Sequence, residues 1–200
     1  MSVSPDLASS AQRVIADLQE LAALTSDANG AQRVAWGPIW RKARDWFRGK
    51  VESELGLKIQ TDSAGNNHVV LPGSSDATVI VASHLDSVPN GGWLDGCLGV
   101  LAGLEALRRH AQQKDRKATL RLIDWADEEG ARFGRSLVGS SAAGGSLNLE
   151  DIRNLKDRQG VTQAEALKEN GVNIENMLNA HAELKKIPAK AYLELHIEQG

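Results

Sequence analysis

The chain has 200 residues, of which 42% are hydrophobic and 24% are charged. This composition is typical of a globular protein with one sizeable core, and it excludes an intrinsically disordered chain. The 26 acidic and 23 basic residues give a net charge of -3 without a basic stripe, so we expect no nucleic-acid partner. The longest apolar runs fall well short of the ~20 residues of a membrane-spanning helix, so we expect no membrane partner.

The N-terminus and the single cysteine indicate where the protein resides. The first residues lack the basic segment and apolar core of a secretory signal. Cys97 is the only cysteine, which excludes an internal disulfide framework and is typical of a reducing compartment. We therefore expect a cytoplasmic protein in which Cys97 is a small buried residue.

The first part of the chain is predicted to form two helices joined by a loop. Apolar side chains recur every three or four residues over 6–24, which predicts an amphipathic helix. A polar loop with the turn signal Asn29-Gly30 follows. Pro38 suits the first turn of a second helix, whose apolar stripe extends to about Gly56.

The remainder of the chain is predicted to alternate strands with helices. Strands are predicted where residues are apolar throughout or alternate with polar ones, at 57–61, 68–71, 77–83, 118–126 and 189–196. A long helix is predicted over 98–112, and short helices within 131–145 and 148–185. Strands separated by helices indicate an α/β fold with a mostly parallel sheet flanked by helices.

Side chains that can bind a metal follow three of these strands. They are His84, Asp86 and Asp95 after the first buried strand, Glu128 and Glu129 after the next, and His196 in the last. Ligands of open α/β sheets bind beyond the carboxyl ends of the strands, so we expect these side chains to meet. Imidazoles combined with carboxylates suit Zn, Mn, Co or Ni, and carboxylates can bridge two ions.

Each of these residues has a simpler interpretation when it is taken alone. His84 is then a satisfied polar residue, Asp86 a turn residue and Asp95 the cap of the following helix. The adjacent Glu128 and Glu129 are then solvated surface. Their coincidence at three successive strand ends favours a metal site, because a cation would relieve the repulsion between neighbouring acids.

The other histidines and most tryptophans are interpreted as structural. His68, His110 and His181 have no acidic partner at ligand spacing, so we expect them to be surface or core residues. Trp40 fits the apolar face of the second helix, whereas Trp93 lies in the candidate metal loop and its role stays open.

The spacing also suggests roles for the carboxylates. Asp86 lies two residues from His84 and can hold the far nitrogen of that imidazole, which would fix its tautomer. Glu128 and Glu129 are adjacent, so one can ligate a metal while the other faces the substrate and transfers protons.

Four motifs occur in a fixed order along the chain. They are Ser-His-Leu-Asp-Ser at 83–87, Gly-Gly-Trp-Leu-Asp-Gly-Cys-Leu-Gly-Val at 91–100, Asp-Glu-Glu-Gly-Ala-Arg-Phe at 127–133 and Glu-Leu-His-Ile-Glu-Gln-Gly at 194–200. In combination they closely resemble the amidase/hydantoinase/carbamoylase family of binuclear metallohydrolases. That family includes N-carbamoyl-L-amino-acid hydrolases, allantoate amidohydrolases and some β-ureidopropionases.

The resemblance implies a role for each site residue. The metal ligands that it implies are His84, Asp95, Glu129 and His196. It implies that Asp95 bridges two divalent ions and that Glu128 is the general base. It further implies that Asp86 orients His84 and that Gln199 contacts the substrate.

The implied reaction is metal-dependent hydrolysis of a carbamoyl or ureido C–N bond by a metal-activated water. N-carbamoyl-L-amino acids and allantoate are the implied small-molecule substrates. An aminoacylase or dipeptidase of the same superfamily is the alternative enzyme, and an inactive metal-binding module is the alternative from another class.

The resemblance also implies an aminopeptidase-like metallohydrolase catalytic domain that is incomplete here. In the family, a lid and dimerisation domain interrupts the catalytic domain. We therefore expect residues 1–200 to form the N-terminal segment, without the lid domain, the last histidine ligand or the C-terminal catalytic segment. The family's expected assembly is a homodimer.

Overall fold

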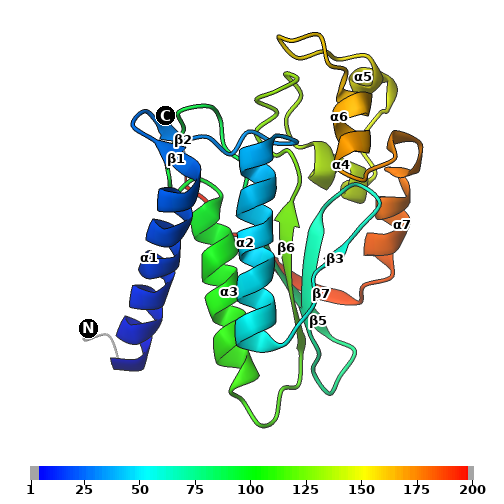
Figure 1. Ribbon diagram of the computed structural model, residues 1–200. Coiled ribbons are helices and arrows are strands. Elements are labelled where there is room, and N and C mark those ends of the chain that lie inside the picture. Colours follow the sequence, from blue (N-terminus) through cyan, green and yellow to red (C-terminus); the bar gives the residue numbers. More distant parts are fainter. Residues whose placement is uncertain (1–4, 198–200) are drawn as a thin grey trace.

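A five-stranded mixed sheet lies between two groups of helices in the computed structural model, which describes residues 5–197 (Figure 1). The strands, in their order across the sheet, are β3 (Gln60–Thr61), β4 (Asn67–Leu71), β6 (Thr119–Trp125), β5 (Thr78–His84) and β7 (Ala189–Leu193). The strand β5 pairs in parallel with β6 and β7, whereas β4 runs antiparallel to both β3 and β6. The predicted α/β class is confirmed, and the strands that precede the candidate ligands form the parallel part of the sheet.

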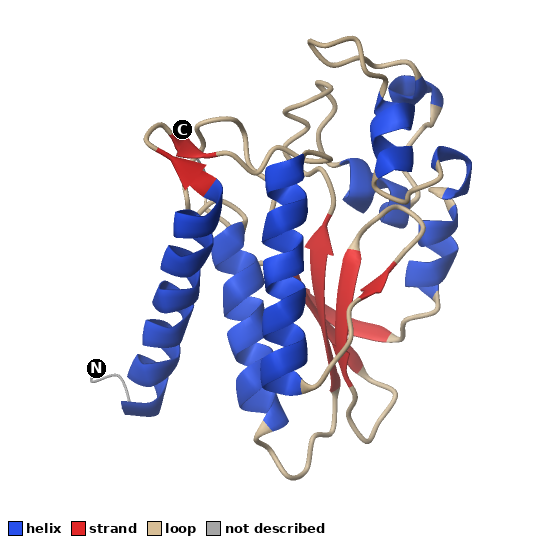
Figure 2. Cartoon of the chain, in the orientation of Figure 1, coloured by secondary structure: helices blue, strands red, loops and turns tan. Residues whose placement is uncertain are grey.

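Three long helices lie on one side of the sheet, and Figure 2 shows them side by side. They are α1 (Pro5–Thr25), α2 (Pro38–Leu55) and α3 (Cys97–Ala111). Leu122 of β6 points into this layer and packs in one cluster with Phe47 of α2 and Leu104 of α3. All three helices were predicted from apolar periodicity, and Gly56 ends α2 in the left-handed conformation at φ 65°.

Short helices cover the opposite face. They are α4 (Val138–Gly144), α5 (Glu150–Arg153), α6 (Gln163–Glu169), the 3₁₀ helix η1 (Ile174–Asn176) and α7 (Asn179–Lys185). Ile80 and Ile123 point to this side and pack in a second cluster with Leu167 and Met177. Alternate residues of β5 and β6 thus enter different cores, as the pleat of a strand requires.

Three segments differ in detail from the sequence prediction. The strand predicted over 57–61 is reduced to β3 (Gln60–Thr61). The loop after α1 contains a short hairpin of β1 (Ser26–Asp27) and β2 (Gly30–Ala31). The last strand ends at Leu193 rather than at His196, so His196 lies in the segment beyond it.

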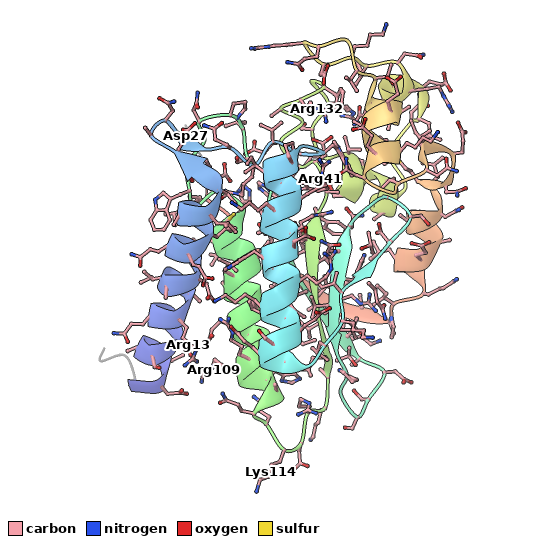
Figure 3. The ribbon with its side chains drawn as sticks, viewed as in Figure 1. Arg13, Asp27, Arg41, Arg109, Lys114 and Arg132 are labelled. Atoms are coloured by element: carbon pink, nitrogen blue, oxygen red, sulfur yellow. The ribbon has the colours of Figure 1, made fainter. Side chains whose placement is uncertain are left out.

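Ion pairs join α1 to α3. Arg13 pairs with Glu105, and Arg109 pairs with Asp6 at 2.7 Å. Figure 3 labels both arginines where the two helices run together. The Arg109–Asp6 pair is exposed and contributes little, whereas the carboxylate of Glu105 in the other pair is buried.

Within residues 5–197, no helix has both the length and the apolar character needed to cross a membrane. Cys97 begins α3 and is fully buried, as predicted. Burial raises the pKa of its thiol to about 12, which keeps it in the unreactive protonated form.

Candidate metal site

Four of the predicted residues converge beyond the C-terminal ends of the parallel strands. His84 ends β5, Glu128 follows β6, and His196 follows β7. The Nε2 atoms of His84 and His196 lie 3.2 Å apart. The His84 Nε2 atom lies 3.5 Å from Oε2 of Glu128 and 3.8 Å from Oδ1 of Asp95. The same Asp95 oxygen lies 3.6 Å from Nε2 of His196.

These spacings fit the donor set of a divalent cation. Donors that lie 2.0–2.2 Å from a tetrahedral ion are about 3.3–3.6 Å from one another. His84, Glu128 and His196 each offer a ligand atom, and these atoms all lie within 4.8 Å of one another. Oε1 of Glu129 is buried and has no hydrogen-bond partner among the described residues, which is rare for a carboxylate. The residues present therefore form a possible metal site.

Asp86 connects His84 to the turn that carries the two glutamates. Asp86 is fully buried, and its backbone oxygen lies 3.1 Å from Nδ1 of His84, while Oδ1 lies 3.4 Å from the same nitrogen. Its other oxygen, Oδ2, accepts a 3.0 Å hydrogen bond from the backbone N–H of Glu129. With Nδ1 directed at Asp86, the His84 ring presents Nε2 to the cluster.

Negative charge accumulates around the imidazole of His84. Burial alone would lower the pKa of His84, but three carboxylates, led by Asp86, outweigh it and raise that pKa to about 9. Burial and the charge of Asp95 raise the pKa of Glu129 to about 7. Burial also raises the pKa of Glu128. Crowded acids of this kind are typical of sites that bind a cation.

The affinity of the site for a divalent ion should rise with pH. A ligand must release its proton before it can bind a metal, and the relevant pKa values are about 9 for His84 and about 7 for Glu129. Protonation therefore competes with the metal as the pH falls from 9 to 7. The affinity for the metal should fall by up to about tenfold per pH unit for each proton that binding releases. Calorimetric titration in buffers of different ionisation enthalpy measures both the affinity and the protons released. An affinity that is constant over this range would contradict the expectation.

Gly96 is a site residue that sequence reasoning missed. Its φ is 64°, and a Cβ atom there would lie 2.4 Å from the backbone oxygen of His84 and 2.5 Å from Nδ1 of that ring. Only glycine lets the start of α3 approach the imidazole so closely. The Asp95-Gly96 pair in the sequence indicated a turn or a helix cap at this position. The sequence did not indicate that Gly96 contacts His84.

A buried ion pair beneath the site was also missed. Nε of Arg44, on α2, lies 2.7 Å from Oδ2 of Asp124 on β6. The other Asp124 oxygen accepts a 2.9 Å hydrogen bond from the backbone N–H of Leu85. The pair therefore fixes the chain between His84 and Asp86.

Two further residues that the sequence singled out are not assigned to the cluster. Gln199 lies outside the described residues, and Trp93 is 41% exposed on the loop before α3. His68 is buried, in line with the prediction that it is a surface or core residue, but it has an acidic partner. The short β3–β4 hairpin brings Asp62 Oδ2 to 3.2 Å from its Nε2, a pairing that spacing along the chain did not reveal.

Comparison with known proteins places the chain in a family. Residues 80–200, which include every residue of the cluster, match the sequence profile of the peptidase family M20/M25/M40. The chain belongs to this family. An N-carbamoyl-L-amino acid amidohydrolase of Geobacillus stearothermophilus is 39% identical over 174 residues, covering 86% of this chain and 42% of that protein. An allantoate amidohydrolase of Escherichia coli strain K12 is 33% identical over 177 residues, with the same two coverages of 86% and 42%.

Solved structures agree with this placement. A hydantoinase/carbamoylase family amidase from Burkholderia ambifaria superposes with a TM-score of 0.78 and 32% identity, covering 94% of this M20-family chain and 45% of that chain. The resemblance predicted from the four motifs is therefore confirmed. The chain spans less than half the length of these relatives.

Proposed function

We propose that this M20-family chain forms the metal-binding part of an amidohydrolase that cleaves a carbamoyl or ureido C–N bond. The convergence of two imidazoles and two carboxylates at donor spacings of 3.2–3.8 Å is the observation that carries the proposal. The relatives named as N-carbamoyl-L-amino acid and allantoate amidohydrolases support the substrate class. N-carbamoyl-L-amino acids and allantoate are accordingly the substrates to test.

The proposal includes two divalent ions, drawn from Zn, Mn, Co and Ni. The ligands would be His84, Asp95, Glu129 and His196, with Asp95 bridging. Its support is the position of Asp95, whose Oδ1 lies within 3.8 Å of both imidazole nitrogens. When bound, such ions polarise a carbonyl and provide a nucleophilic water at neutral pH.

Glu128 would transfer the proton in this reaction. Its side chain is 24% exposed and therefore accessible to a substrate, and its Oε2 lies 3.5 Å from Nε2 of His84. The raised pKa of Glu128 brings it closer to the operating pH, where a general base is most effective. Glu128 would take a proton from the attacking water and return it to the leaving nitrogen, while Asp86 keeps the His84 ring in place.

Three further parts of the proposal concern the surroundings of the site. Gln199 would contact the substrate. A cytoplasmic location is supported by the single, buried Cys97, which fits a reducing compartment. A homodimer would follow the family's assembly.

Metal titration combined with substrate assays tests the proposal. We expect the chelator-treated chain to bind Zn²⁺ or Mn²⁺ stoichiometrically, and His84→Asn to bind far more weakly because an imidazole donor is lost. We expect metal-dependent release of ammonia from N-carbamoyl amino acids or allantoate. Binding that is equal in the chain and in His84→Asn would contradict the metal site, and cleavage of dipeptides alone would contradict the substrate class.

A further inference from the structure

Two buried residues with left-handed backbone meet behind the turn that carries Glu128 and Glu129. They are Trp36, with φ 63°, and Asp127, with φ 56°. Nε1 of Trp36 donates a 2.7 Å hydrogen bond to Oδ2 of Asp127, and both residues are essentially inaccessible to solvent. A bulky residue such as tryptophan rarely adopts this conformation. Such outliers persist where the surroundings impose them, and they cluster at functional sites.

Asp127 is also held by residues of the short helices. Besides Trp36, the amide Nε2 of Gln163 lies 3.3 Å from the same Asp127 oxygen. The backbone oxygen of Asp127 accepts a 3.1 Å hydrogen bond from Val138. Asp127 is thus held by residues of α4 and α6, while Oε2 of the adjacent Glu128 lies 3.5 Å from Nε2 of His84.

Trp36 also holds the far end of the same turn. Its backbone oxygen accepts a 2.9 Å hydrogen bond from Nη1 of Arg132, which lies three residues beyond Glu129. Figure 3 labels Arg132 near the short helices at the top of the molecule. The Trp36 backbone oxygen also accepts a 3.2 Å bond from Nδ2 of Asn170. Trp36 therefore contacts the residue before the two glutamates and a residue after them.

We propose that Trp36 is a positioning residue that acts through Asp127 and Arg132. It fixes the turn so that Glu128 and Glu129 both converge on His84. The inference rests on the proposed function, because it assigns Trp36 to the same metal site.

A matched pair of tryptophan variants tests the inference. Trp40 is 2% exposed, its ring centroid lies 4.8 Å from that of Trp36, and its buried Nε1 has no hydrogen-bond partner among the described residues. Trp36→Phe and Trp40→Phe therefore remove the same atoms from the same core, but only the first removes a hydrogen bond to the turn. We expect Trp36→Phe to lower the affinity for Zn²⁺ by about tenfold, and Trp40→Phe to change it by less than about twofold.

Amide exchange of the metal-free chain gives a second readout. The backbone N–H of Glu129 donates to Asp86, so its exchange rate reports directly on the position of the turn. We expect faster exchange at Glu129 in Trp36→Phe than in the wild type or in Trp40→Phe. Both rates and affinities are measured at a temperature where circular dichroism shows all variants folded.

Equal affinity and equal exchange in the two tryptophan variants would overturn the inference. If Trp36→Phe does not fold, Gln163→Leu removes the other donor to Asp127 and must change both readouts in the same direction. A wild-type chain that neither binds metal nor hydrolyses a ureido compound overturns the proposed function, and the exchange rate at Glu129 still decides whether Trp36 positions the turn.

Discussion

Replacement of Glu128 with Gln is expected to reduce turnover by orders of magnitude while leaving metal binding largely intact. The amide keeps the size of the side chain but cannot accept a proton from the attacking water. A general base contributes about 10²–10⁴-fold to the rate, so turnover should fall by this factor. Ammonia release at saturating metal measures the rate, and calorimetry measures the affinity for the metal.

Glu129→Gln is the matched control because it makes the same chemical change one residue away. Oε1 of Glu129 is buried without a hydrogen-bond partner among residues 5–197, so removing its charge should weaken metal binding. Glu128 is also placed to bind the metal. Its Oε2 lies only 3.5 Å from Nε2 of His84, and it forms a group of possible ligands with His84 and His196. If Glu128→Gln loses metal as strongly as Glu129→Gln, Glu128 is a metal ligand as well. If only Glu128→Gln loses metal, the two glutamates exchange roles. Wild-type turnover in Glu128→Gln would exclude it as the base.

The features of this fold and site that could be predicted are those that depend on local sequence patterns. The strand over 77–83 was recognisable because it is apolar throughout, and it appears as β5. The convergence of His84 and Glu128 was predictable because parallel neighbouring strands must end at the same edge. Family motifs then added roles for the residues, which spacing alone left open between Glu128 and Glu129.

The contacts that hold these residues in place were not predictable. Trp36 and Asp127 are separated by 91 positions, and Asn67 and Asp124 by 57. Hydrogen bonds between residues so far apart produce no periodic pattern in the sequence. Which residues pair depends on how the helices pack on the sheet. The position of β4 is a related case: its antiparallel pairing with β6 depends on strand order, which hydrophobic patterning does not encode.

Replacement of Arg44 with Met is expected to destabilise the fold strongly. Asp124 has no exposed side-chain surface, and burial already raises its pKa even with Arg44 lying beside it. Removal of the cation leaves a buried charge without a partner, which costs about 3–5 kcal/mol of the free energy of unfolding. Urea unfolding followed by circular dichroism measures the loss.

The same helix supplies the control. Arg48 pairs with Asp45 at 2.6 Å, but the Asp45 side chain is 72% exposed. Arg48→Met should therefore cost no more than about 1 kcal/mol, although the pair has a shorter ion-pair distance than Arg44 and Asp124. A loss in Arg44→Met as small as that in Arg48→Met would show that the buried pair contributes little.

The loss in Arg44→Met should also depend on pH in a definite direction. Without Arg44, the pKa of Asp124 rises further above its value in the unfolded chain, because the opposite charge that lowered it is gone. Below the pKa of Asp124 in the unfolded chain the carboxyl is neutral in both states, so the destabilisation is small at acidic pH. It grows as the pH rises from that value to the raised pKa of the folded chain, and it is constant above it. Since Asp124 also accepts the N–H of Leu85, metal affinity should fall together with stability. A loss that is independent of pH would assign the effect to the packing of the arginine stem rather than to its charge.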